Sequence, residues 1–149
     1  MAYEQLKLEN QLCFPLYAAS RLVIQAYQPH LEKLGLTYPQ YLVLMILWET
    51  DNLSVNEIAH RLILNTNTIT PVLKRMEAQG LIARKRSEED ERRVIVTLTP
   101  KGKQLQIEAA PIPEKLVAGL VSDDINLHEL QALKDQLHML IHHLSNQQA

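Results

Sequence analysis

The side chain best suited to covalent chemistry is that of Cys13, the only cysteine in the 149-residue chain. A lone cysteine cannot form an internal disulfide, and it has no companion at the spacing of zinc ligands. Pro15 fits the first turn of a helix, so Cys13 is expected at or just before a helix start. The dipole at a helix N-terminus favours a thiolate, and phenol hydroxyls can hydrogen-bond to one. From the residues alone, Cys13 is either a reactive thiol or a small buried hydrophobe.

Charged side chains suggest a second function, because a basic segment lies between two acidic ones. Residues 1–60 carry three Lys or Arg against six Asp or Glu, residues 61–103 carry ten against five, and residues 104–149 carry two against six. The net charge of −2 conceals this division. The pattern indicates an anion-binding element carried between acidic arms, with a merely solvated charged surface as the alternative.

Helix signals dominate the elements that must position these groups. Capping-box spacing occurs twice, at positions 37–40 and 54–57. Helices are expected over about 14–34, 37–48 and 54–62, with a fourth ending before Gly80. Residues 65–68 offer several N-caps for this fourth helix, whereas Pro71 would place its start at Thr70.

After Gly80 the apolar period changes from 3.6 residues to two, which is typical of strands. Residues 81–85 and 94–97 are expected to form a β-hairpin with a charged tip. Two short helices and a hairpin follow the order of a winged helix-turn-helix, which places one helix in the major groove of DNA and the hairpin in the minor groove. The expected DNA contacts are Thr66, Asn67, Thr68, Lys74, Arg75, Arg84, Arg86, Asp90, Arg92 and Arg93, with Asp90 and Arg92 able to lock the hairpin loop.

The C-terminal segment is helical again. Thr99-Pro100 begins a helix that Pro111 and Pro113 must bend or interrupt. A last helix, over about 124–144, carries leucines seven residues apart and needs a partner helix. We expect one domain over residues 1–149 that is mostly α with a small β-hairpin wing. Residues 37–103 would form the winged helix-turn-helix, and residues 1–36 and 104–149 would form dimerisation helices.

Several function classes are disfavoured. The longest apolar run, residues 42–48, is far shorter than the ~20 residues that span a bilayer, and the N-terminus lacks a signal pattern, which favours a cytoplasmic protein with no membrane partner. No Gly-x-Ser-x-Gly elbow supports a catalytic triad. His138 and His142 could hold a metal, but an exposed helical face explains them better. We therefore expect no enzyme, no cofactor and no metal.

Four segments carry a resemblance to a known family. They are Leu-Glu-Asn-Gln-Leu-Cys-Phe at 8–14, Leu-Thr-Tyr-Pro-Gln-Tyr-Leu at 36–42, Thr-Pro-Val-Leu-Lys-Arg-Met-Glu at 70–77, and the hairpin segment at 84–92. From about residue 8 to residue 99 the chain resembles the MarR family of winged-helix regulators. The cysteine together with Thr-Tyr-Pro-Gln-Tyr is similar to the OhrR branch of organic-hydroperoxide sensors. Residues after Gln104 match weakly beyond their helical pattern.

The resemblance implies a homodimeric repressor that binds a pseudo-palindromic operator in double-stranded DNA and releases it after oxidation by an organic hydroperoxide. It implies that Cys13 is the peroxide-reactive thiol, near the partner subunit's Tyr27 and Tyr38 with Tyr17 close by, and that Arg92 is the wing arginine. Pro15 departs from the helix former expected at that place, which affects the shape of the thiol pocket. Because no second cysteine follows, a low-molecular-weight thiol or further oxidation must complete the switch.

Two alternatives remain open at this point. One is a MarR-type regulator that is released by a small aromatic ligand at the dimer interface, with Cys13 as a spectator. The other is a thiol peroxidase that uses Cys13 for turnover, which the lack of a resolving cysteine disfavours.

Overall fold

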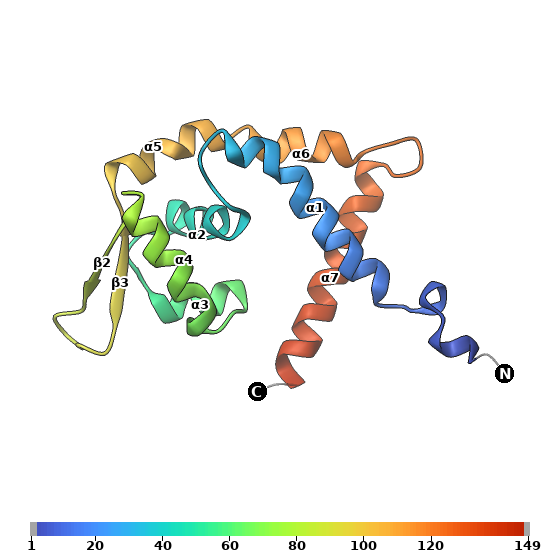
Figure 1. The fold of residues 1–149 in the computed structure, drawn as a ribbon, viewed down its shortest axis with the longest axis horizontal. Helices are drawn as coiled ribbons and strands as arrows, with labels where there is room; N and C mark the ends of the chain where they lie inside the picture. Colours follow the sequence, from blue (N-terminus) through green and yellow to red (C-terminus); the bar gives the residue numbers. More distant parts are fainter. Residues whose placement is uncertain (1–2, 148–149) are drawn as a thin grey trace. The chain divides into compact units, whose positions relative to one another are not determined.

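The computed structural model describes residues 3–147, which divide between Ala110 and Pro111 into two compact units. Two short 3-10 turns, Glu4–Leu6 and Leu8–Asn10, precede the first helix. The remaining elements of the first unit are α1 (Phe14–Glu32), α2 (Tyr38–Glu49), β1 (Leu53–Ser54), α3 (Val55–Leu62), α4 (Thr66–Ala78), β2 (Ile82–Arg86), β3 (Val94–Leu98) and α5 (Pro100–Ala109) (Figure 1). The second unit contains α6 (Ile112–Leu120) and α7 (Leu127–Gln147).

Both predicted capping boxes are present. At the start of α2, the Thr37 hydroxyl accepts the Gln40 N–H at 3.4 Å, and the Gln40 side chain accepts the Thr37 N–H at 3.2 Å. At the start of α3, the corresponding two bonds between Ser54 and Glu57 are both 3.1 Å. Each box satisfies N–H groups that a helix start otherwise leaves without partners. The starts of α2 and α3 are therefore fixed by the local sequence.

Helix α4 begins a turn earlier than the Thr70 start that Pro71 favoured. Asn65 is its N-cap, and its side-chain oxygen accepts the Thr68 N–H at 3.0 Å. Ile69 and two later apolar residues of α4 are fully buried, so packing of this stripe extends the helix across the proline. Tertiary contacts thus outweigh the helix-breaking tendency of Pro71.

The predicted hairpin is part of an antiparallel three-stranded sheet in the order β1-β3-β2. Ile82 pairs with Leu98 at one end of the hairpin and Arg86 with Val94 at the other. The two-residue strand β1, which was not expected from the sequence, pairs Leu53 with Val96 on the other edge of β3. Together with the helices, this sheet confirms the predicted fold: mostly α, with a winged helix-turn-helix and a small β wing.

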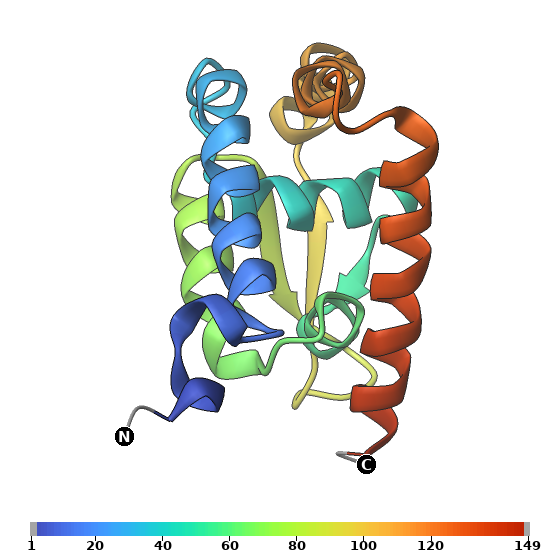
Figure 2. The same cartoon turned by 90° about the vertical axis from the view of Figure 1, so that its right-hand side faces the viewer.

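The core of the first unit lies among α2, α3, α4 and the sheet, and in Figure 2 α2 crosses in front of the strands. Its largest fully buried side chains are Tyr41, Val43, Leu44, Leu47, Ile58, Ile69, Leu73, Met76, Ile82 and Val96. Helix α5 is attached at Gly102, where a Cβ would overlap the Leu81 carbonyl oxygen. The Trp48 indole N–H donates to the Gly102 carbonyl oxygen at 2.9 Å. Only glycine permits this close approach.

In the second unit, α7 begins at Leu127, three residues later than predicted. Asn126 and Glu129 exchange two hydrogen bonds of 2.9 Å, which form a capping box that fixes this start. Large apolar side chains on α7 are exposed in the single chain, among them Leu133 (53%), Met139 (72%), Leu140 (42%) and Leu144 (47%). Within residues 3–147, no helix is both long and apolar enough to cross a membrane.

Candidate DNA-binding face and thiol site

The helix that would enter the major groove is α4, and the structure shows which of its predicted contacts are available. Asn67, Thr68, Lys74 and Arg75 are exposed, while Thr66 is half-buried. The Thr68 hydroxyl lies 3.1 Å from the Asn65 side-chain oxygen, so the helix cap already uses it. Among residues 3–147, the side chains of Asn67, Lys74 and Arg75 form no hydrogen bond, so these three can turn toward a ligand.

The wing tip is held by the interaction predicted between Asp90 and Arg92. One carboxylate oxygen of Asp90 accepts the Arg92 backbone N–H at 3.1 Å and its Nε–H at 3.2 Å. The Arg92 side chain is 92% exposed. Arg86 closes the same loop by donating to the Glu91 carbonyl oxygen at 2.9 Å. The guanidinium of Arg92 is therefore both positioned and accessible.

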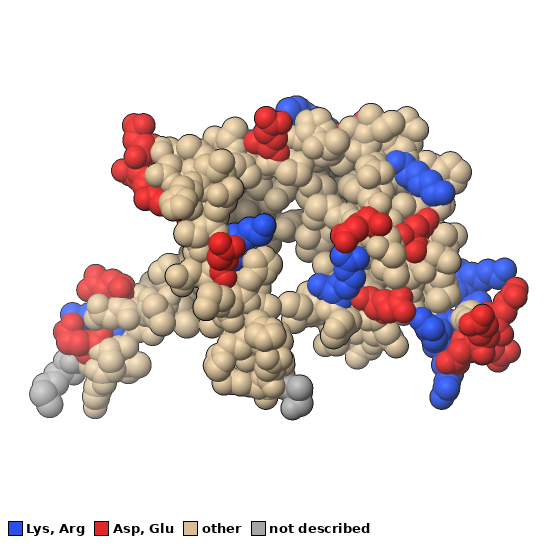
Figure 3. Space-filling model, turned by 180° about the vertical axis from the view of Figure 1, so that it is seen from behind, with Lys and Arg blue, Asp and Glu red and all other residues tan. Residues whose placement is uncertain are grey.

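Two other predicted arginines attach the wing to the helices instead of projecting from it. Arg84 lies 3.2 Å from the Glu77 carboxylate of α4, and these hydrogen bonds lower the pKa of Glu77. Arg93 lies 2.9 Å from the Glu57 carboxylate of α3. Figure 3 shows basic and acidic side chains interleaved over the end of the molecule that carries the wing. Much of the wing's positive charge is thus matched within the protein.

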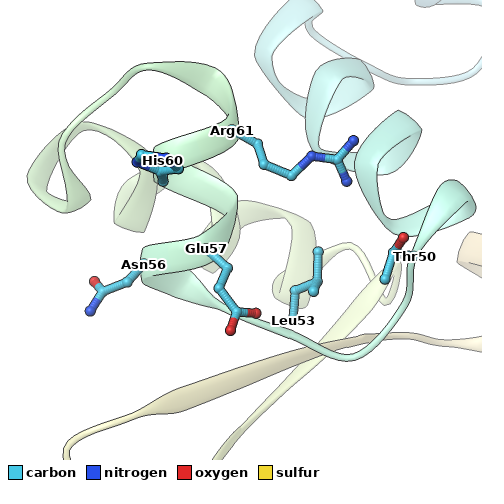
Figure 4. A pocket seen from close by; sticks show the side chains of 6 residues that line it. All are labelled: Thr50, Leu53, Asn56, Glu57, His60 and Arg61. Carbon is cyan, nitrogen blue, oxygen red and sulfur yellow. The ribbon is translucent and has the colours of Figure 1, made fainter. Parts of the chain in front are cut away.

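A shallow hollow of about 380 Å³ lies beside α3, between the end of α2 and β1 (Figure 4). Figure 4 shows Arg61 extended toward α2 and Glu57 toward the strands. Both are already paired, Arg61 with Glu49 at 2.9 Å and Glu57 with Arg93 at 2.9 Å. The hollow is therefore bordered by the ion pairs that brace α3.

Cys13 occupies the N-cap position of α1 and is exposed. This agrees with the predicted position at the helix start, and it excludes the reading of Cys13 as a buried residue within the single chain. Tyr17 lies one turn further along, 61% exposed, with the Arg21 guanidinium 4.9 Å from its ring centre. A thiol in this place is open to a small reagent.

Tyr27 and Tyr38 form a cluster with a third phenol, that of Tyr41. The ring centres lie 4.8 Å apart for Tyr27–Tyr38, 5.8 Å for Tyr27–Tyr41 and 6.3 Å for Tyr38–Tyr41. Burial and the two neighbouring phenols raise the pKa of Tyr27 to about 12, and burial raises the pKa of Tyr38. Both groups therefore stay protonated at neutral pH, where they can donate hydrogen bonds. Tyr41 was missed in the sequence, although its spacing of three from Tyr38 places both on one helix face.

The single chain does not bring Cys13 and the tyrosine cluster together. Cys13 is the N-cap of α1, and Tyr27 lies fourteen residues further on, in the C-terminal half of the helix. At 1.5 Å per residue this is a separation of about 21 Å. Only a second subunit could bring the thiol of one chain beside the phenols of another.

The fold and the exposed polar face of α4 define a winged-helix protein of the DNA-binding class. Comparison with known families agrees, since residues 25–108 match the model described as transcriptional regulator SarA/Rot. The chain belongs to this MarR-like winged-helix family of transcriptional regulators.

Individual relatives match most of the chain. A Bacillus subtilis protein named organic hydroperoxide resistance transcriptional regulator is 49% identical over 139 residues, which cover 93% of this chain and 92% of that protein. The structure of reduced AbfR bound to DNA, from a protein of Staphylococcus epidermidis, has a TM-score of 0.77 at 38% identity and covers 97% of this chain and 99% of that one. Overoxidized AbfR bound to DNA has a TM-score of 0.74 at 40% identity, with 95% and 97% covered.

Proposed function

We propose that this protein is a homodimeric DNA-binding repressor that senses organic hydroperoxides by oxidation of Cys13 and then releases its operator. The observation that carries this proposal is the exposed Cys13 at the N-cap of α1 in a winged-helix chain. The name of the Bacillus subtilis relative supports the same signal. A sensor of this kind acts in the cytoplasm and consumes peroxide stoichiometrically, without turnover as an enzyme.

The proposed first step is attack of the Cys13 thiolate on the terminal oxygen of the hydroperoxide. An S–O bond forms, the O–O bond breaks, and the departing alkoxide takes a proton to leave as an alcohol. The cysteine is oxidised to a sulfenic acid, and the peroxide is reduced. Cys13 is exposed, so a hydroperoxide can reach its sulfur.

The proposed second step is capping of the sulfenic acid by a low-molecular-weight thiol. Sulfur–sulfur bond formation expels the hydroxyl group as water and leaves a mixed disulfide on Cys13. No second cysteine competes for this step within the chain. Overoxidized AbfR has been seen on DNA, so for this chain we expect the bulky mixed disulfide to be the form that releases DNA.

Dimerisation would assemble the sensing site and the DNA-binding surface together. Residues 1–36 and 104–149 are the proposed dimerisation helices, and exposed apolar side chains at Leu12 (91%) and along α7 are available for burial. A dimer would place the thiol of one chain near Tyr27 and Tyr38 of the other. Its two winged helices, with Asn67, Lys74, Arg75 and Arg92, would meet the two half-sites of a pseudo-palindrome.

Titration of the promoter beside the protein's own gene tests this proposal. Reduced protein should bind, and one equivalent of organic hydroperoxide followed by a small thiol should release it. Release by a small aromatic ligand without peroxide would instead indicate the alternative function, a ligand-pocket regulator that binds such a ligand at the dimer interface. Continued peroxide consumption over many turnovers with excess thiol would indicate a thiol peroxidase.

Removing the phenol hydroxyls should affect sensing but not DNA binding. Tyr27→Phe and Tyr38→Phe each remove one hydrogen-bond donor while the contact between the two rings remains. We expect oxidation of Cys13 to slow by about 12-fold for each, since one hydrogen bond to a charged group is worth about 1.5 kcal/mol. Stopped-flow oxidation with mass spectrometry measures this rate. Tyr3→Phe, outside the cluster, is the matched control, and equal slowing in all three variants would contradict the assignment.

Loss of the wing arginine should weaken DNA binding. Arg92→Ala removes an exposed guanidinium that Asp90 positions, and we expect a loss of about 1–3 kcal/mol in DNA affinity. Oxidation of Cys13 should proceed as in the parent protein. Lys85→Ala, which removes an 80% exposed cation from the same hairpin, is the control for charge alone. If both variants lose affinity equally at several salt concentrations, Arg92 has no special place in the groove.

A further inference from the structure

Pro71 lies in the middle of α4, although proline is disfavoured inside helices. It lies at the sixth residue of the helix, where it has no N–H to donate to the Asn67 carbonyl four residues earlier. In general a proline ring also crowds the carbonyl four residues earlier, so proline is the most unfavourable residue for a helix interior. Residues that violate a local rule are expected where a protein needs them for function. The side chain is nevertheless exposed and packs against no core.

The position of Pro71 on the helix is more informative than its exposure alone. The inner face of α4 consists of three fully buried apolar residues, Ile69, Leu73 and Met76. At 3.6 residues per turn, the face opposite consists of Asn67, Pro71, Lys74 and Ala78, all of them exposed. Pro71 therefore lies at the centre of the surface that would face the major groove, with a basic side chain one turn beyond it.

The proline ring restricts what this surface can recognise. Its neighbours Thr68 and Thr70 direct their hydroxyls to the helix, the latter to the Thr66 carbonyl oxygen at 2.7 Å. The ring itself carries no donor and no acceptor, so it can distinguish bases only by apolar contact. In the major groove thymine alone presents an apolar group, its C5 methyl.

We propose that Pro71 reads a thymine methyl group in each operator half-site, an inference that rests on the DNA binding proposed above. The methyl would lie against the ring while Asn67 and Lys74, on either side, make polar contacts. A rigid ring reaches this contact without losing rotamer entropy. On this proposal Pro71 determines sequence specificity, and it is more than an unfavourable helix residue that the fold tolerates.

Deoxyuridine scanning tests the proposal, because uracil differs from thymine only by the missing methyl. The probe is a duplex selected from a random pool with this protein, in which each thymine is replaced in turn. With the parent protein, one position per half-site should lose about fourfold in affinity, the value of one buried methyl group. Pro71→Ala should abolish that position's sensitivity, and Pro71→Val, which keeps an apolar branched side chain, should retain part of it.

Pro29 offers a matched control, since it is also an exposed proline inside a helix, α1. Pro29→Ala should leave the deoxyuridine profile as in the parent protein. If the parent has no sensitive thymine, or if Pro71→Ala keeps the same sensitive position, the assignment of Pro71 is overturned while DNA binding stands. If the pool yields no bound duplex at all, the proposed DNA-binding function fails first and this inference with it.

Discussion

Replacement of the sensing thiol, Cys13→Ser, should yield a repressor that stays on DNA in the presence of organic hydroperoxide. Only a thiolate attacks the peroxide oxygen readily, whereas a serine hydroxyl stays protonated and inert at neutral pH. Because Cys13 is exposed and forms no cap hydrogen bond, the substitution removes no packing contact of the single chain. We expect reduced Cys13→Ser and the parent protein to have equal operator affinity.

The measurement is a fluorescence-anisotropy titration with operator DNA, before and after peroxide and a small thiol. The oxidised parent should bind about 5- to 150-fold more weakly, the usual range of coupling between two sites, and excess reductant should restore it. Cys13→Ser should show neither effect. If this variant still leaves DNA on treatment with organic hydroperoxide, Cys13 is not the sensor and the ligand-pocket regulator becomes the better interpretation.

Disruption of the apolar stripe on α7 should separate the proposed dimer and abolish operator binding together. Leu140 is 42% exposed in the single chain and shares a helix face with Leu133 and Leu144. Leu140→Glu therefore adds a charge at little cost to the monomer, but several kcal/mol to a dimer that must bury it in both copies. We expect a monomer by analytical ultracentrifugation at micromolar concentration, and at least about a hundredfold loss of operator affinity.

Met139→Glu is the matched control for this prediction. Met139 is 72% exposed and lies about 100° around α7 from Leu140, outside the leucine stripe, so the same charge enters the same helix at a different face. This variant should remain dimeric and bind operator. A dimeric Leu140→Glu protein, or equal dissociation of both variants, would show that the stripe is not the dimer contact.

Local signals made much of the fold predictable. The capping boxes that begin α2 and α3 and the change of period after Gly80 each depend on neighbouring residues, and all three were confirmed. Strand β1 was not predictable in this way, because two residues show no period and exist as a strand only by pairing with β3. The start of α4 could not be decided between residues 65–68 and Thr70 for a similar reason, since the burial of its apolar stripe is a tertiary effect.

Contacts between neighbouring residues of the candidate site were predictable from the sequence, whereas contacts between distant segments were not. The short loop at Asp90–Arg92 could be foreseen because both partners are two residues apart. The ion pair between Arg93 and Glu57 spans 36 residues, so no local pattern signals it, and from the sequence Arg93 was expected only as a DNA contact. The same limit hid Tyr41, whose contact with Tyr27 depends on how α1 packs against α2.

The ion pairs that the wing arginines form within the protein affect how many copies of the protein a cell needs to occupy its operator. Non-specific affinity for DNA comes from cations that are free to displace counterions from phosphates. Arg84 and Arg93 are matched by carboxylates, so they displace few counterions on random sequence. A chromosome offers about 10⁶ to 10⁹ competing sites, and a protein that binds them weakly is not sequestered by them. A small number of dimers then suffices to keep the target gene silent.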